Sequence, residues 1–183
     1  MPRTTEREPT VQEADAIVEA VEQGTDQIAL ARDMQTEAEI EHDPPLPVKI
    51  QGLAVPQRIK LALTGNRGAR AVLIRDQNKL IRHYVLRNPR LTEDEVLIMA
   101  KDKNIDEESL RFITVRREWM KAYQIRLAIA QNPRAPIPQA IHLLSTLFKR
   151  DLERIAKSRD VTQAVVVHAR KLVIQARERG QSR

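Results

Sequence analysis

The chain has no cysteine and few aromatic residues. Without cysteine it cannot form disulfides, thiolate metal sites, iron–sulfur clusters or a cysteine nucleophile. The two phenylalanines, two tyrosines and one tryptophan leave a core of aliphatic side chains and few rings on which nucleic-acid bases could stack. No stretch approaches the roughly 20 apolar residues of a membrane span, and the first residues lack the basic start and apolar run of a signal peptide. The sequence therefore predicts a cytoplasmic protein.

Glycine is also scarce, and no Asn-Gly pair indicates a β-hairpin. Apolar residues instead recur with the helical period between helix start and stop signals. Thr92 and Glu95 have the spacing of a capping box, and Pro56 suits the first turn of a helix. Two further helices are predicted near residues 106–114 and 117–131. These patterns predict an all-α fold.

One phrase occurs twice in the chain. Asn88-Pro89-Arg90 recurs 44 residues later as Asn132-Pro133-Arg134, and residues 98–105 are echoed 56 residues later by residues 154–161. Proline ends the preceding helix, and asparagine both tolerates the left-handed conformation and bonds nearby backbone, so Asn88, Pro89, Asn132 and Pro133 are predicted to be structural turn residues. Because the two spacings differ, we expect degenerate stacked helical units, one of which carries an insertion.

These phrases resemble those of the leucine-rich-repeat-variant and HEAT-like helical repeats, in which Asn-Pro precedes each helix. Residues 88–92 and 132–136 match that pattern, and residues 55–173 also look like a group of bacterial proteins of unknown function. The resemblance implies a right-handed stack of short helix pairs, an α-solenoid. It carries over no catalytic residue. The iron–sulfur cluster of one variant-repeat protein needs cysteines that this chain lacks.

Charge is distributed unevenly along the chain. Residues 1–44 hold three arginines and twelve carboxylates, a net charge of −9, so residues 45–183 carry +15 of the total of +6. We interpret residues 1–44 as an acidic, partly disordered segment with one or two marginal helices, residues 45–54 as a proline-containing linker, residues 55–178 as the helical-repeat domain and residues 179–183 as a tail. The acidic segment could be a solvated spacer, an internal mimic of an acidic ligand or a partner-binding segment. On this division the domain should fold without residues 1–44.

No catalytic constellation is found in the sequence. His42, His83, His142 and His168 are far apart and none has a metal-binding spacing. Residues 65–68 lack the spacing of a phosphate-binding loop. We therefore expect no enzyme activity, no metal and no cofactor.

Two functions remain. Stacked short helices usually bind proteins, so the first hypothesis is a non-catalytic interaction scaffold or adaptor with a protein partner. The alternative is a nucleic-acid-binding module that uses the basic face of residues 45–183 and is modulated by the acidic segment. The single tryptophan, Trp119, and Tyr123 are predicted to lie in the core. The candidate binding surface consists of arginines along consecutive predicted helices, together with the arginines of the two Asn-Pro-Arg phrases: Arg67, Arg70, Arg75, Arg82, Arg87, Arg90 and Arg134.

Overall fold

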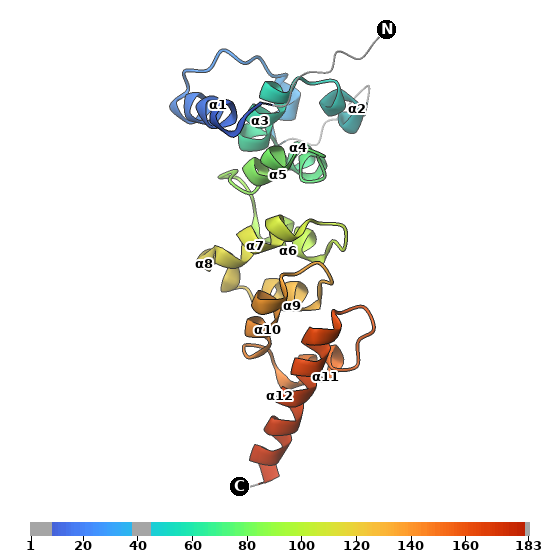
Figure 1. The fold of residues 1–183 in the computed structure, drawn as a ribbon. Coiled ribbons are helices and arrows are strands. Elements are labelled where there is room, and N and C mark those ends of the chain that lie inside the picture. The colour runs from blue at the N-terminus through green and yellow to red at the C-terminus, as the bar shows by residue number, and fades with distance from the viewer. Residues whose placement is uncertain (1–8, 38–44, 182–183) are drawn as a thin grey trace. The chain divides into compact units, whose positions relative to one another are not determined.

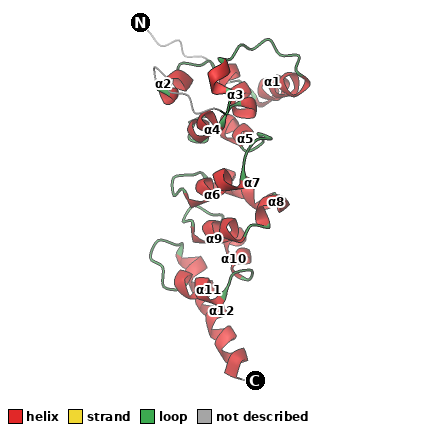
Figure 2. Cartoon of the chain, turned by 180° about the vertical axis from the view of Figure 1, so that it is seen from behind, coloured by secondary structure: helices red, strands yellow, loops and turns green. Residues whose placement is uncertain are grey.

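The computed structural model describes residues 9–37 and 45–181, and every regular element in them is a helix (Figures 1 and 2). The prediction of an all-α fold is therefore confirmed. The chain divides into two compact units, residues 1–91 and residues 92–183, which we call the N-terminal and C-terminal units. The domain boundary predicted between residues 44 and 45 stays a prediction, because residues 38–44 lie outside the described residues.

The described residues of the N-terminal unit, 9–37 and 45–91, form five α-helices and one 3-10 helix. Their bounds are α1 (Val11–Gln23), η1 (Arg32–Met34), α2 (Leu46–Gln51), α3 (Val55–Thr64), α4 (Arg67–Leu73) and α5 (Lys79–Val85). Helix α2 occupies the segment predicted to be a linker. Pro47 lies in its first turn, where a residue without an N–H donor loses no helical hydrogen bond.

The acidic segment is part of the core of this unit. Thr10 and Glu13 form a capping box that begins α1, and Gly24 ends the helix in the left-handed conformation with φ of 68°. Helix α1 packs on α3 and buries Ala14 and Val18 completely or nearly so. Because apolar burial of this kind stabilises a helix that would be marginal alone, the first helix is not a separate tail.

The C-terminal unit contains seven helices in its described residues. They are α6 (Glu93–Lys101), α7 (Glu107–Val115), α8 (Arg117–Met120), α9 (Tyr123–Gln131), α10 (Ile137–Leu144), α11 (Lys149–Ile155) and α12 (Gln163–Gln181). The capping box of Thr92 and Glu95 is present as predicted. The helix predicted for residues 117–131 is two helices, and α12 continues through the first residues of the predicted tail.

Buried asparagine side chains join helices in both units. Asn88 Nδ2 donates to the carbonyl oxygens of Ala62 at 2.9 Å and Gly65 at 3.4 Å, at the end of α3. Asn132 Nδ2 donates to Ala100 and Asp102 at 2.8 and 2.9 Å, at the end of α6. Each Oδ1 atom accepts from the backbone N–H two residues later. The carboxamides thereby satisfy carbonyl groups that have no partner within their own helix.

Asn66 uses the same chemistry inside the N-terminal unit. Its Nδ2 donates to the carbonyls of Asp33 and Thr36 at 2.9 and 2.8 Å, and its Oδ1 accepts from the N–H of Ala69. The side chain thus ties the end of the acidic segment to the start of α4. The neighbouring Gly65 is needed for close approach, because a Cβ atom there would lie 2.4 Å from the carbonyl oxygen of Leu61.

None of these asparagines adopts the left-handed conformation that asparagine tolerates in turns. Asn132 has φ of −79° and ψ of 125°, and no residue other than glycine has a positive φ in the described ranges. Asn88 and Asn132 join helices through the hydrogen bonds of their side chains and do not use the backbone freedom of the left-handed region.

An arginine accompanies each Asn-Pro phrase. Arg82 Nη1 donates to the carbonyls of Asp76 and Gln77, and Arg126 Nη1, 44 residues later, donates to those of Met120 and Lys121. In both places the guanidinium holds the turn that precedes its own helix. The repeated spacing of the Asn-Pro phrase therefore extends to a second set of side-chain hydrogen bonds.

Replacing Asn132 tests the hydrogen-bonding role of these side chains. Asn132→Ala should lower the free energy of unfolding by about 2 to 3 kcal/mol, because it leaves buried carbonyl groups without donors. Asn132→Gly should cost at least as much, since glycine supplies no donor. Chemical denaturation measures both effects, with exposed Asn104→Ala as a control that changes stability by less than about 0.5 kcal/mol. A well-tolerated glycine would show that Asn132 acts only as a turn former.

Two valines on α1 test whether the acidic segment packs on α3. Val18 is 3% exposed and Val11 is 60% exposed. Val18→Asp should destabilise the protein by about 3 kcal/mol, because it buries a carboxylate against apolar side chains, whereas Val11→Asp should be nearly neutral. Thermal melting of the two variants makes the comparison, and equal melting temperatures would contradict the packing of α1.

Candidate functional site

Arg70, one of the predicted surface arginines, is buried. Its side chain is 1% exposed, and Nη1 donates to the carbonyl of Gly65 and to Glu37 Oε1, both at 2.9 Å. A long cationic side chain can be buried when charge and hydrogen bonds compensate the loss of water, as they do here. The assignment of Arg70 to a binding surface is therefore wrong.

Four more predicted arginines bind groups of their own unit. Arg75, Arg82 and Arg90 donate to backbone carbonyls, and Arg90 also lies 3.8 Å from Glu37. Arg87 pairs with Glu22 of α1 at 2.9 Å. Two arginines of the predicted set are exposed and make no side-chain bond to the described residues: Arg67, in the N-terminal unit, and Arg134, in the C-terminal unit.

Carboxylates of the acidic segment meet the cations of the N-terminal unit at several places. Asp26 pairs with Lys60 at 2.6 Å, and Asp33 with Lys49 at 3.3 Å. The hydrogen bond from Lys60 holds the pKa of Asp26 below its ordinary value. Burial alone would raise the pKa of Glu37, but the N–H of Arg67 and the guanidinium of Arg70 lower it. Lys49, Lys60 and Arg70 are thus already paired with carboxylates of their own unit, which weakens the attraction of this unit for a polyanion.

The two units differ in net charge. The N-terminal unit has thirteen basic and thirteen acidic residues, whereas the C-terminal unit has eighteen basic and twelve acidic residues. The net charge of +6 therefore resides in the C-terminal unit. Residues 45–183, whose net charge is +15, do not correspond to either of the two compact units.

The predicted aromatic core pair is only partly buried. Trp119 lies on α8, a single turn with no buried residue, where its ring is 6.3 Å from Phe112 and carries the Arg116 guanidinium at 5.8 Å. Tyr123 is also partly exposed, and its hydroxyl donates to Asp151 and accepts from the N–H of Phe148. Trp119 and Tyr123 therefore do not form the predicted core. The predicted helix is interrupted between α8 and α9, so the two residues do not share one helical face.

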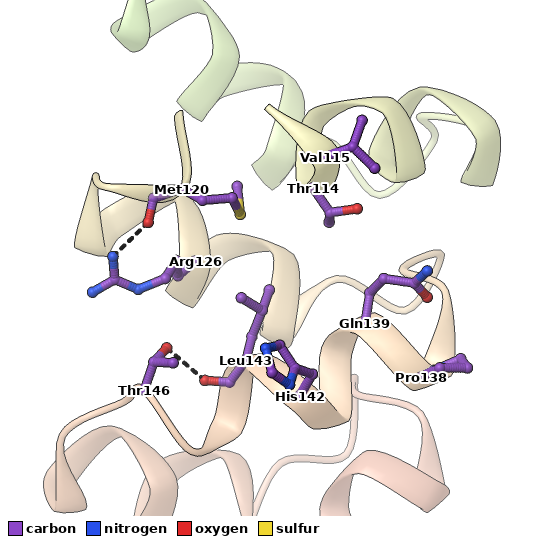
Figure 3. Close-up of a pocket in the computed structure, with 9 residues that line it drawn as sticks. All are labelled: Thr114, Val115, Met120, Arg126, Pro138, Gln139, His142, Leu143 and Thr146. Carbon is purple, nitrogen blue, oxygen red and sulfur yellow. Dashed lines mark hydrogen bonds between the residues drawn. The ribbon is translucent and has the colours of Figure 1, made fainter. Parts of the chain in front are cut away.

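An apolar groove lies among α7, α8, α9 and α10 of the C-terminal unit and has a volume of about 670 Å³. Figure 3 shows Thr114, Val115 and Met120 on one side, His142 and Leu143 on the other, Arg126 at one end and Pro138 with Gln139 at the opposite end. Val115 is 67% exposed, although it is aliphatic. We call this cavity the α7–α10 groove; it is lined by Thr114, Val115, Met120, Arg126, Pro138, Gln139, His142, Leu143 and Thr146.

A buried polar atom lies at each end of the α7–α10 groove. Gln139 Oε1 and Arg126 Nε are buried and make no hydrogen bond within residues 9–37 and 45–181. Such groups cost free energy in the absence of a partner. No carboxylate lines the groove, so its character is apolar with a cationic end.

A second cavity of about 320 Å³ lies among α6, α9 and α11 and is more polar. Lys101, Lys103 and Arg154 line it, but Lys103 pairs with Asp160 and Arg154 with Asp151, at 2.9 and 2.8 Å. The hydrogen bond and charge of Lys103 also lower the pKa of Asp160. Because two of the three cations are already paired, this cavity is a weaker candidate than the groove.

Within residues 9–37 and 45–181, no three histidine or acidic side chains form a group that could hold a metal ion. No helix of the same residues combines the length and apolar character required to cross a bilayer. Comparisons of the chain with protein-family models, with curated proteins and with solved structures give no match. The site must therefore be judged from its own geometry.

The contact between α1 and α5 can be tested by titrating Tyr84. Burial, and then the hydrogen bond from the Tyr84 hydroxyl to Asp15 at 3.1 Å, raise the pKa of Tyr84 to about 12. Since the unfolded value is near 10, the contact contributes stability in full below pH of about 10 and loses it as the pH rises toward 12. Ultraviolet titration in a Tyr123→Phe background should show this late ionisation. Asp15→Asn should move the pKa of Tyr84 toward its ordinary value. An ordinary pKa for Tyr84 in the parent protein would contradict the contact between α1 and α5.

Proposed function

We propose that this protein is a non-catalytic interaction scaffold and that the α7–α10 groove receives apolar side chains of a protein partner. The exposure of Val115 beside the apolar walls of the groove carries this proposal. Isolated exposed aliphatic residues are common, but an exposed residue on the rim of an apolar cavity extends a surface that a partner can cover. We place this activity in the cytoplasm.

The proposal includes a stack of degenerate helical repeats of the HEAT-like kind, with a right-handed arrangement of short helix pairs. The hydrogen bonds of Arg82 and Asn88 recur at Arg126 and Asn132, and this recurrence supports a common origin of the two segments. Repeat proteins present grooves between their helices, and variation of the groove side chains changes the partner while the backbone is maintained.

A scaffold accounts for the charged residues better than an enzyme does. The buried ionic groups, such as Arg70 and Asp151, are held by hydrogen bonds that join helices. None of these groups lines the α7–α10 groove, where a reaction would need positioned acids, bases or nucleophiles.

Nucleic-acid binding is the second candidate, and one observation favours it. Between residues 149 and 177 the C-terminal unit has eight basic residues against three carboxylates, and most of the basic side chains are exposed. A polyanion could use this surface. Against it stand the neutral charge of the N-terminal unit and the scarcity of exposed aromatic rings.

Peptide display on the full chain separates the two functions. Random displayed peptides selected against the protein should include binders whose affinity falls at least about tenfold in Val115→Glu. Val115 is exposed, so this variant should keep its melting temperature. Val11→Glu, which places the same change on an exposed valine of α1, should leave binding unaltered.

The opposite result would be an absence of groove-dependent binders together with tight, salt-sensitive binding of DNA or RNA homopolymers. That outcome would contradict the proposed scaffold function and support nucleic-acid binding.

A further inference from the structure

Cationic residues of α8, α9 and the turn between them adjoin the α7–α10 groove, and we call Arg117, Lys121 and Arg126 its cationic rim. Arg126 lines the groove, and the other two are neighbours in sequence of the groove residue Met120, which Lys121 directly follows and Arg117 precedes by three residues. Arg117 and Lys121 are exposed, and neither side chain makes an ion pair in the described residues. Glu118 is the single carboxylate between residues 116 and 126, and it is 3.6 Å from Arg116.

Arg126 is held in position before any partner binds. Its Nη1 atom donates to the carbonyls of Met120 and Lys121 at 2.6 and 2.9 Å, and its guanidinium lies 5.6 Å from the centre of the Tyr123 ring. The described chain provides no hydrogen-bond partner for its Nε atom. A guanidinium fixed in this way loses little conformational entropy when a carboxylate approaches it.

The N-terminal unit shows how this chain pairs an apolar face with acidic flanks. Helix α1 buries Ala14 and Val18 against α3, while Asp15 accepts from the Tyr84 hydroxyl and Glu22 pairs with Arg87. The acidic residues beside the apolar stripe orient the helix without being buried themselves. A helix of the same chemistry would complement the α7–α10 groove and its cationic rim.

We propose that the partner segment is an amphipathic helix with an apolar face that fills the α7–α10 groove and carboxylates along the edge that meets Arg117, Lys121 and Arg126. The apolar contacts supply affinity, and the charges set the orientation and the choice of partner. This inference rests on the proposed function, because it specifies the occupant of the same groove.

A helical peptide library tests the charge of the partner. The apolar positions are fixed as leucine, isoleucine or phenylalanine, and the flanking positions sample glutamate, lysine, glutamine and serine. After selection against the full chain, groove binders are those whose affinity falls in Val115→Glu. We expect these peptides to be enriched in glutamate along one flank, and their affinity to decline as salt is added.

Variants of the rim locate the charge contact. The double variant R117Q/K121Q should weaken the glutamate-rich peptides by about threefold to tenfold and leave neutral peptides unchanged. Lys157→Gln, an equivalent change at an exposed residue of the same unit, should have no such effect. Both changes lie at exposed positions, so circular dichroism should show an unchanged fold.

The outcomes for the two proposals are distinct. The proposal of an acidic helix would be contradicted if groove-dependent peptides were not enriched in glutamate, or if glutamate-rich peptides bound R117Q/K121Q as tightly as the parent. The groove would then remain a protein-binding site. A library without any binder that depends on Val115 would overturn the groove and the helix together. Binding of an RNA or DNA homopolymer that depends on Arg117 and Lys121 would assign the rim to nucleic acid instead.

Discussion

The carboxamides of Asn66, Asn88 and Asn132 connect parts of the fold that are about 23 to 33 residues apart in sequence, by donating to carbonyl groups at the ends of helices or turns. Short helices leave a large fraction of their carbonyls without partners, since the last four of any helix have none. Water can satisfy such groups at the surface but not where another helix covers them. A buried asparagine solves this problem because its two N–H donors reach two carbonyls while its oxygen accepts from the next turn. Helix packing in both units depends on this interaction.

Charge in this protein is used mainly inside each unit. Arg82 and Arg126 hold turns, Arg70 bridges a carbonyl and a carboxylate, and Lys60 pairs with Asp26. The acidic N-terminal residues consequently neutralise the unit to which they belong. The C-terminal unit carries exposed cations and an apolar groove, and our proposal of an acidic helical partner rests on this combination.

Local signals in the sequence predicted much of the secondary structure. The capping box at Thr92 and the helix ends at Asn88 and Asn132 were predictable because they depend on residues within a few positions of one another. The packing of α1 on α3 was not predictable in this way. The number of carboxylates in a segment does not show which cations of the fold they pair with. The surface role of Arg70 failed for the same reason: an arginine that solvates a turn and one that is buried beneath it have the same sequence signal.

Trp119 illustrates a different limit. The apolar period of residues 117–131 was continuous enough to predict one helix, but the backbone ends α8 after one turn and starts α9 at Tyr123. The break separates Trp119 from the rest of its predicted helical face, of which Leu127 and Ala130 are buried on α9. The α7–α10 groove was also missed, because its walls come from four helices. Its one local sign is Val115, an apolar residue beyond the predicted end of its helix.

Exchange of the side-chain amide protons of asparagine tests the central role of these residues most directly. In nuclear magnetic resonance spectra of the folded protein, the Nδ2 protons of Asn66, Asn88 and Asn132 should exchange with solvent at least about tenfold more slowly than those of exposed Asn104, because each pair is buried and bonded to two carbonyl groups. Equal exchange rates at all four residues would contradict the account.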